Sequence, residues 1–129
     1  LSAIVSAVEI QLSFEQLNEF REINNEVPIH MRIGIHTGVI VLGNVGTVQR
    51  MEWTAIGDVV NTAARIEKAA KKGNVLISDI TYEEVRDQVT VKEDIEINVK
   101  GKVHLLKLHY VDTVTFLIRG QTQILKLPS

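Results

Sequence analysis

The spacing of apolar residues changes near residue 30, and this change constrains the fold more than any other feature of the sequence. Over the first twenty residues the spacing is that of one face of a helix. The residues on this stripe are Leu1, Ile4, Val5, Val8, Leu12, Leu17 and Phe20. We expect the helix to end near Asn24 and Asn25, because Pro28 disfavours its continuation. From Met31 to Ile35 apolar residues alternate with other residues, which is typical of a strand.

The rest of the chain mixes the two spacings. Turn residues at 43–49 between two extended segments predict a hairpin over 39–56. Asp58 is a suitable N-cap for a helix to about Lys72, and Thr81 opens a short helix with a capping-box pattern. The other predicted strands are 75–78, 89–92, 95–99, 103–111, 114–118 and 122–127. Helices mixed with hairpins predict an α+β fold with a largely antiparallel sheet.

Composition excludes several classes of protein. The chain has 129 residues, enough for one domain, and 45% of them are hydrophobic, so it is not disordered by composition. It has no cysteine, which rules out disulfides and thiol catalysis and permits a reducing compartment. A net charge of −2 gives no basic surface for nucleic acid, and the longest apolar run, 39–42, is too short to span a bilayer. We therefore expect a cytoplasmic domain, although its parent protein could be membrane-anchored.

The segment from Met31 to Glu67 carries the most specific information. It reads MRIGIHTGVIVLGNVGTVQRMEWTAIGDVVNTAARIE. It resembles the class III adenylate and guanylate cyclases, in which a strand of the form R-[IV]-G-[IV]-H-x-G leads into a G-x-x-G turn and later into I-G-D-x-V-N-x-A-A-R on a helix. The matches continue through 75–78, 81–82 and 99–102, so that the resemblance covers about residues 7–111.

This resemblance implies a particular fold. Cyclase domains have a ferredoxin-like, palm-type architecture, in which flanking helices cover a mostly antiparallel sheet. The opening strand-helix-helix-hairpin of that architecture has no counterpart here, so we expect a cyclase domain that is truncated at its N-terminus. Residues 1–112 would form the partial cyclase domain. Residues 113–129 would be a C-terminal strand pair or an extension of the same domain.

Asn61 and Arg65 are the candidate catalytic residues. They lie four residues apart and so share one face of the predicted helix. A guanidinium can hold the negative charge that develops during transfer at phosphorus, and an amide can orient a ribose. The resemblance implies these roles for Arg65 and Asn61. The alternative is a solvated Asn and a surface Arg paired with Glu52 or Glu67.

Three further residues are candidate substrate contacts on the resemblance alone. Lys100, in a Lys-Gly-Lys turn, would reach the terminal phosphates, and Arg32 would contact the triphosphate. Their alternatives are a solvated turn lysine and a strand arginine paired with an acid. Thr54 occupies the position that reads the purine edge, where many bacterial adenylate cyclases have Thr. It favours ATP, although a hydroxyl can both donate and accept and does not itself separate adenine from guanine.

His36 and Asp58 invite catalytic interpretations that we do not favour. His36 is a candidate general base, but a histidine on a strand is more often a hydrogen-bonded structural residue. Asp58 stands at a helix start, where capping and the helix dipole account for a carboxylate without a metal. We therefore assign no metal ligand in this chain.

The missing metal ligands determine the functional expectation. Class III cyclases use Mg²⁺ or Mn²⁺ held by two aspartates, and neither aspartate context occurs here. We expect part of a lyase that makes cyclic AMP from ATP for intracellular signalling and is inactive alone. It would act as a homodimer or with a complementing cyclase domain. The alternatives are a guanylate cyclase that uses GTP and a non-catalytic dimerisation or regulatory module.

Overall fold

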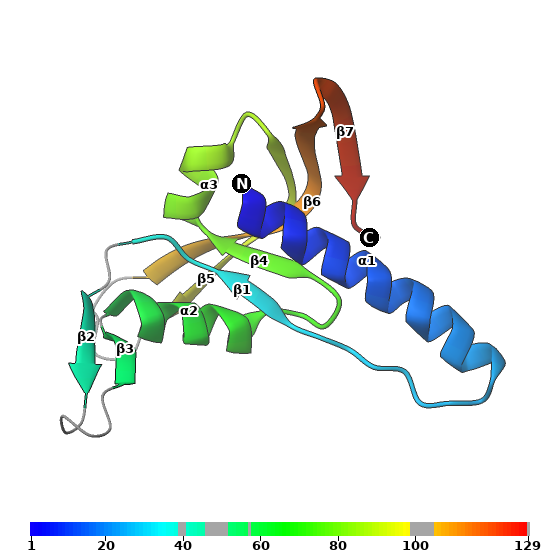
Figure 1. The fold of residues 1–129 in the computed structure, drawn as a ribbon, viewed down its shortest axis with the longest axis horizontal. Helices are drawn as coiled ribbons and strands as arrows, with labels where there is room; N and C mark the ends of the chain where they lie inside the picture. The colour runs from blue at the N-terminus through cyan, green and yellow to red at the C-terminus, as the bar shows by residue number, and fades with distance from the viewer. Residues whose placement is uncertain (39–40, 46–51, 57, 99–104, 129) are drawn as a thin grey trace.

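A computed structural model of the chain describes residues 1–38, 41–45, 52–56, 58–98 and 105–128. These residues form helices and strands in the order α1, β1, β2, β3, α2, β4, α3, β5, β6, β7 (Figure 1). Their bounds are α1 Ser2–Ile23, β1 Ile33–Ile35, β2 Val41–Val45, β3 Glu52–Ile56, α2 Asp58–Ala69, β4 Val75–Ser78, α3 Asp79–Val85, β5 Val89–Asn98, β6 Leu105–Ile118 and β7 Gln121–Lys126. None of the helices in these ranges is long and apolar enough to cross a membrane.

The main sheet is mostly antiparallel and is arranged around β4 and β6. Its strands follow the order β1-β4-β6-β5, and β7 pairs with the distal part of β6. The β1–β4 pair is parallel, whereas β4, β5 and β7 all run antiparallel to β6. The β2–β3 hairpin forms a separate two-stranded sheet that projects from one end of the molecule (Figure 1). This is the α+β, palm-type arrangement expected from the sequence.

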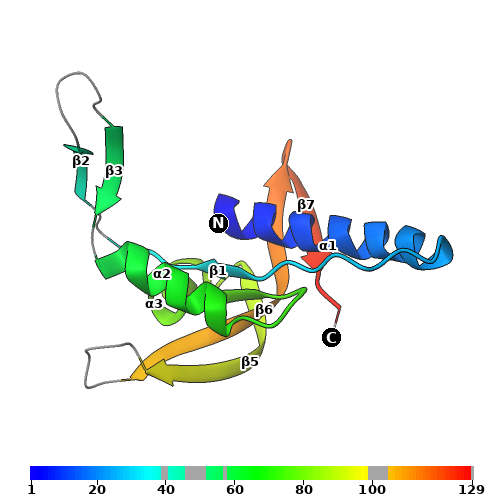
Figure 2. The same cartoon turned by 90° about the horizontal axis from the view of Figure 1, so that it is seen from below.

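Strand β4 separates two hydrophobic cores. All four of its residues are buried, so it is covered on both faces. Val75 and Ile77 belong to the core that α1 and α3 cover, together with Val111 and Val114 of β6. The alternate residue Leu76 belongs to the other core. That core contains Ile66, Ala70, Leu76, Leu108 and Tyr110. Helices α1 and α2 therefore lie on opposite faces of the sheet (Figure 2).

Local sequence signals placed most elements correctly. Helix α1 ends at Ile23, and Asn25 follows in the left-handed region at φ 56°, a conformation that Asn tolerates better than most residues. The hairpin forms with Val41 opposite Ile56. Helix α2 begins at Asp58, as expected, but ends at Ala69 rather than near Lys72.

Three predictions of element bounds were wrong. The third helix begins at Asp79, not at Thr81, because Ser78 is its N-cap and accepts a hydrogen bond from the backbone N–H of Thr81. The strands predicted at 89–92 and 95–99 form one strand, β5, with register irregularities near Val91. Likewise, 114–118 continues a single long strand, β6, whose two halves pair with different neighbours.

His109 connects β6, on which it lies, to β5 and to the start of helix α3. It is buried on β6, and its Nδ1 lies 2.6 Å from a carboxylate oxygen of Asp94 on β5. Its Nε2 lies 2.6 Å from a carboxylate oxygen of Asp79 at the start of α3. The ring also packs against Tyr82 of α3, with 4.6 Å between the ring centroids. Both polar atoms of a buried ring are thus engaged, and together they fix α3 to the sheet.

We expect His109→Ala to lower the free energy of unfolding by about 2–3 kcal/mol, because it removes a buried ring and two charge-assisted contacts. The exposed neighbour Lys107→Ala is the control and should change it by less than about 0.5 kcal/mol. Urea denaturation followed by circular dichroism measures both. Equal losses in the two variants would contradict the bracing role of His109.

Candidate functional site

Helix α2 presents both candidate catalytic residues. Its buried side is made by Thr62, Ile66 and Ala70, the last of these just beyond the helix end. Asn61 is exposed and Arg65 is partly exposed. The two residues lie about one helical turn apart, roughly 6 Å along the axis. Arg65 forms no ion pair or hydrogen bond with any side chain or backbone group that the structure describes. Of its two candidate partners, Glu67 contacts Arg32, and the side chain of Glu52 lies outside the described part of the chain.

A glycine in β1 sets the position of α2. A Cβ atom built on Gly34 would lie 2.5 Å from the backbone nitrogen of Glu67 and 2.9 Å from its Cα. These are backbone atoms, which cannot rotate away. The absence of a side chain at Gly34 therefore lets the helix lie directly on the strand, and this close approach holds the helix that carries Asn61 and Arg65.

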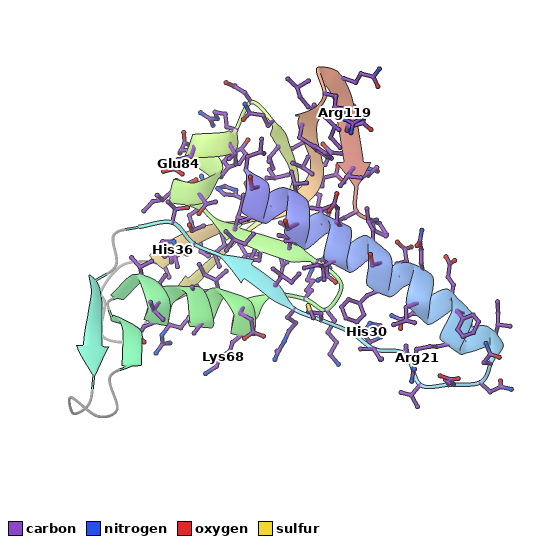
Figure 3. All side chains as sticks on the ribbon, in the orientation of Figure 1. Arg21, His30, His36, Lys68, Glu84 and Arg119 are labelled. Atoms are coloured by element: carbon purple, nitrogen blue, oxygen red, sulfur yellow. The ribbon has the colours of Figure 1, made fainter. Side chains whose placement is uncertain are left out.

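Arg32, just before β1, lies at the far end of α2 from Asn61. Its guanidinium is 3.5 Å from a carboxylate oxygen of Glu67 and 3.5 Å from the backbone oxygen of Lys68. Lys68 is labelled beside the last turns of α2 in Figure 3. The side chain of Arg32 remains 44% exposed, so its contact with Glu67 is weak and easily exchanged. The ion pair with an acid is the alternative that the sequence left open.

His36 belongs to a chain of hydrogen bonds at the end of β1. Its Nδ1 lies 2.7 Å from the hydroxyl oxygen of Ser78, which is 3.0 Å from the hydroxyl of Thr81. The Thr81 hydroxyl is in turn 2.8 Å from that of Thr37. Figure 3 shows His36 between β1 and the start of α2. His36 is therefore hydrogen-bonded into the structure, in agreement with the interpretation favoured from the sequence.

This network was missed from the sequence, where only His36 attracted attention. Ser78 and Thr81 are fully or almost fully buried hydroxyls, and buried hydroxyls require hydrogen-bond partners. The sequence contained one indication of this network, which is the position of Ser78 directly after the apolar run 75–77. A polar residue that ends a buried strand is a candidate cap for the following helix.

The chain that leaves α2 is tied back to the sheet. Lys71 donates a hydrogen bond to Glu93 on β5 at 2.9 Å, and its ammonium lies 5.3 Å from the ring centroid of Tyr110. The Glu93 hydrogen bond, followed by the charge of the same carboxylate, raises the pKa of Lys71. The Tyr110 hydroxyl accepts from the Lys71 backbone N–H at 3.1 Å. These contacts fix the C-terminal end of α2, as Gly34 fixes its middle.

The remaining predicted site residues are not brought to α2 by any described contact. Thr54 lies in β3, paired with Gly43 of β2. Lys100 lies outside the described residues. Among the residues that the structure does describe, no group of three or more histidine, aspartate or glutamate side chains could hold a metal ion.

Comparison with known proteins identifies the class to which this fold and helix belong. The sequence model of the adenylate and guanylate cyclase catalytic domain matches residues 1–120. An adenylate cyclase of Mycobacterium tuberculosis is 39% identical over 75 residues, which are 58% of this chain and 17% of that protein. The crystal structure of a guanylyl cyclase superposes with a TM-score of 0.81 at 30% identity, covering 98% of this chain and 61% of the other. The adenylyl cyclase CyaB from P. aeruginosa gives a TM-score of 0.75 at 28% identity, covering 92% and 60%.

This chain belongs to the adenylate and guanylate cyclase catalytic domain family. It spans 17% of the M. tuberculosis relative and about three fifths of each of the two solved chains. Its relatives carry the names of both adenylate and guanylate cyclases, so family membership does not distinguish cyclic AMP from cyclic GMP as the product.

We expect Gly34→Ala to lower the free energy of unfolding by about 1–3 kcal/mol, because the new methyl group collides with the backbone of α2. Amide chemical shifts along α2 should move with it. Gly120→Ala is a useful control, because a Cβ at that position meets nothing within 4 Å. The only cost of this substitution is the strain of an alanine at a positive φ of 77°. A loss no larger than that of Gly120→Ala, with α2 shifts unchanged, would show that β1 does not fix the helix.

Proposed function

We propose that this chain contributes the transition-state half of a nucleotide cyclase site, which converts ATP to cyclic AMP and pyrophosphate. The observation that supports the proposal is the position of Asn61 and Arg65, which lie one turn apart on the exposed side of α2. Arg65 has no ion pair or hydrogen bond with a described side chain. Family membership supplies the reaction class. Because ATP is an intracellular nucleotide, we assign the activity to the cytoplasm.

The chemistry assigns each residue a role. The ribose 3′-hydroxyl passes its proton to water, its oxygen forms a bond to the α-phosphorus, and the bond from that phosphorus to the pyrophosphate oxygen breaks, which releases pyrophosphate. Negative charge grows on the oxygens around phosphorus during this step. The Arg65 guanidinium hydrogen-bonds those oxygens and stabilises the charge. The Asn61 amide holds the ribose so that the 3′-oxygen lies in line with the leaving group.

The outer contacts are assigned on the family resemblance. Lys100 and Arg32 hold the phosphates, and Thr54 contacts the purine and favours adenine. For Arg32 to do so, its guanidinium must leave Glu67, which the 3.5 Å separation and half-exposed side chains allow at small cost. GTP remains the alternative substrate because a threonine hydroxyl can serve either purine.

The divalent metal ion of the intact enzyme requires ligands from elsewhere. Among the described residues, no group of three or more histidine, aspartate or glutamate side chains could hold a metal ion, and we derive no step from a metal bound to them. The proposal therefore includes a second cyclase domain that carries the metal ligands. Without it, this chain alone is expected to show no substantial activity.

A complementation assay tests this proposal. This chain is mixed with a cyclase domain that keeps its metal ligands but lacks the helix Asn and Arg, and cyclic AMP is measured with ATP and Mn²⁺. We expect activity on mixing and a loss of about 10²–10³-fold with Arg65→Ala, the usual effect of removing a transition-state donor. Arg119→Ala, at the β6–β7 turn, is the matched arginine control and should retain full activity.

Two outcomes would overturn the proposal. If the domains associate but make no cyclic AMP or cyclic GMP, the chain is a non-catalytic binding module. If activity appears but survives Arg65→Ala, α2 does not supply the transition-state contact.

A further inference from the structure

A cavity lies beneath the C-terminal half of α1, away from the α2 site. This half of the helix projects past the sheet, and the chain returns under it through residues 25–32 (Figures 1 and 2). The cavity is open to solvent on one side, its volume is about 810 Å³, and its walls include the turn at 72–74 and Pro128. This volume is within the usual range for small-molecule sites. We call it the α1 overhang cavity.

The cavity is held open by fixed contacts. The side-chain amide of Asn18 donates to the backbone oxygen of Ile29 at 2.8 Å, and its oxygen accepts from the Ile29 N–H at 2.8 Å. Arg21 donates to the backbone oxygen of Val27 at 2.6 Å. The returning segment is thus tied to α1 at two points, so a ligand would meet a preformed site and would lose less free energy in ordering it.

Part of the cavity wall is apolar. It includes Phe14 from α1, with Ile29 and Met31 from the returning segment. Ile29 is 41% exposed and Met31 37% exposed, although both are large apolar residues. An apolar ligand body would remove this surface from water, which is favourable.

The helix side of the cavity is strongly acidic. Glu15, Glu19, Glu22 and Glu26 line it, against one lysine, Lys72. Arg21 neutralises Glu26 at 3.0 Å, but the other three glutamates have no ion pair with any described residue. The C-terminus of α1 also ends here, and a helix C-terminus carries partial negative charge. Figure 3 shows Arg21 and His30 at this end of the molecule.

Gln11 adds an independent source of negative potential. It is 4% exposed and lines the cavity. Its amide nitrogen donates to the backbone oxygens of Met31 at 2.9 Å and Asn74 at 2.8 Å, which uses both N–H groups. Its Oε1 is buried and has no hydrogen-bond donor among the described residues. The oxygen end of this amide dipole is therefore uncompensated, and it favours a positive charge nearby.

We propose that the α1 overhang cavity binds an organic cation, a primary ammonium or guanidinium group attached to an apolar body. The apolar body packs on Phe14, Ile29 and Met31. The cation lies among the glutamates and near the C-terminus of α1. The same chemistry is offered by a free aromatic amine and by a Lys or Arg side chain beside an apolar residue in a peptide. Neither Asn61 nor Arg65 lines this site, and the proposal does not depend on the proposed cyclase activity.

The first test is a titration of the full ¹⁵N-labelled chain with phenethylamine, followed by amide chemical shifts. We expect saturable shifts in α1 and residues 25–31 with a Kd of roughly 1 mM or tighter, weakened by salt. The anion 3-phenylpropionate, of similar shape, should bind at least about tenfold more weakly. Absence of saturable shifts, or equal binding of the anion, would overturn the proposal.

Variants test the acidic wall. The double variant Glu19→Gln and Glu22→Gln should weaken phenethylamine binding about tenfold, while Glu84→Gln on α3, another exposed helical glutamate, should leave it unchanged. Thermal unfolding confirms that each variant is folded. If Glu84→Gln weakened phenethylamine binding as much as the double variant does, the binding would not be specific to this cavity. A titration with acetyl-Phe-Arg-amide distinguishes a peptide ligand from a free amine. Binding at least about tenfold tighter than that of phenethylamine indicates a peptide ligand, and weaker binding indicates a free amine.

Discussion

The structure depends on the complete burial of β4 between two cores. A four-residue strand gains little from its own hydrogen bonds, but Val75 and Ile77 face one core and Leu76 faces the other. The same strand pairs with β1 on one side and β6 on the other. Because the side chains alternate, a one-residue shift of β4 would move each of them into the wrong core. The positions of α1, α2 and α3 therefore follow from one register.

Local features of the sequence were sufficient to predict most elements and the face that Asn61 and Arg65 share. Helical spacing, strand alternation and helix caps all act over a few residues, and the i, i+4 relation on a helix is purely local. The start of α3 was missed because Ser78 and Thr81 are both plausible caps, and only the burial of Ser78 against His36 decides between them. The extent of β6 was missed because its halves find different partners, β5 and β7.

The long-range contacts of the candidate site could not be predicted from one sequence. Arg32 contacts Glu67 and Lys68, more than thirty positions away in the chain. The brace of His109 joins residues of β5 and α3 that lie 15 and 30 positions away. Both depend on how strands are ordered in the sheet, which short-range patterns leave open. Gly34 was recognised as part of a motif, but the sequence did not explain why a glycine is needed there. The explanation is that α2 lies on β1, so that a side chain at position 34 would collide with the backbone of Glu67.

Helices α2 and α1 lie on opposite faces of the sheet, and the two proposals assign them ligands of opposite charge. On one face, Arg65 is proposed to hold a nucleotide phosphate through its guanidinium. On the other, α1 brings several glutamates and its own C-terminal end around an apolar cavity and favours a cation. The glutamates of the second surface repel a polyphosphate. The cavity lining contains none of Asn61, Arg65 and Arg32, so the two proposed ligands would not compete for the same residues.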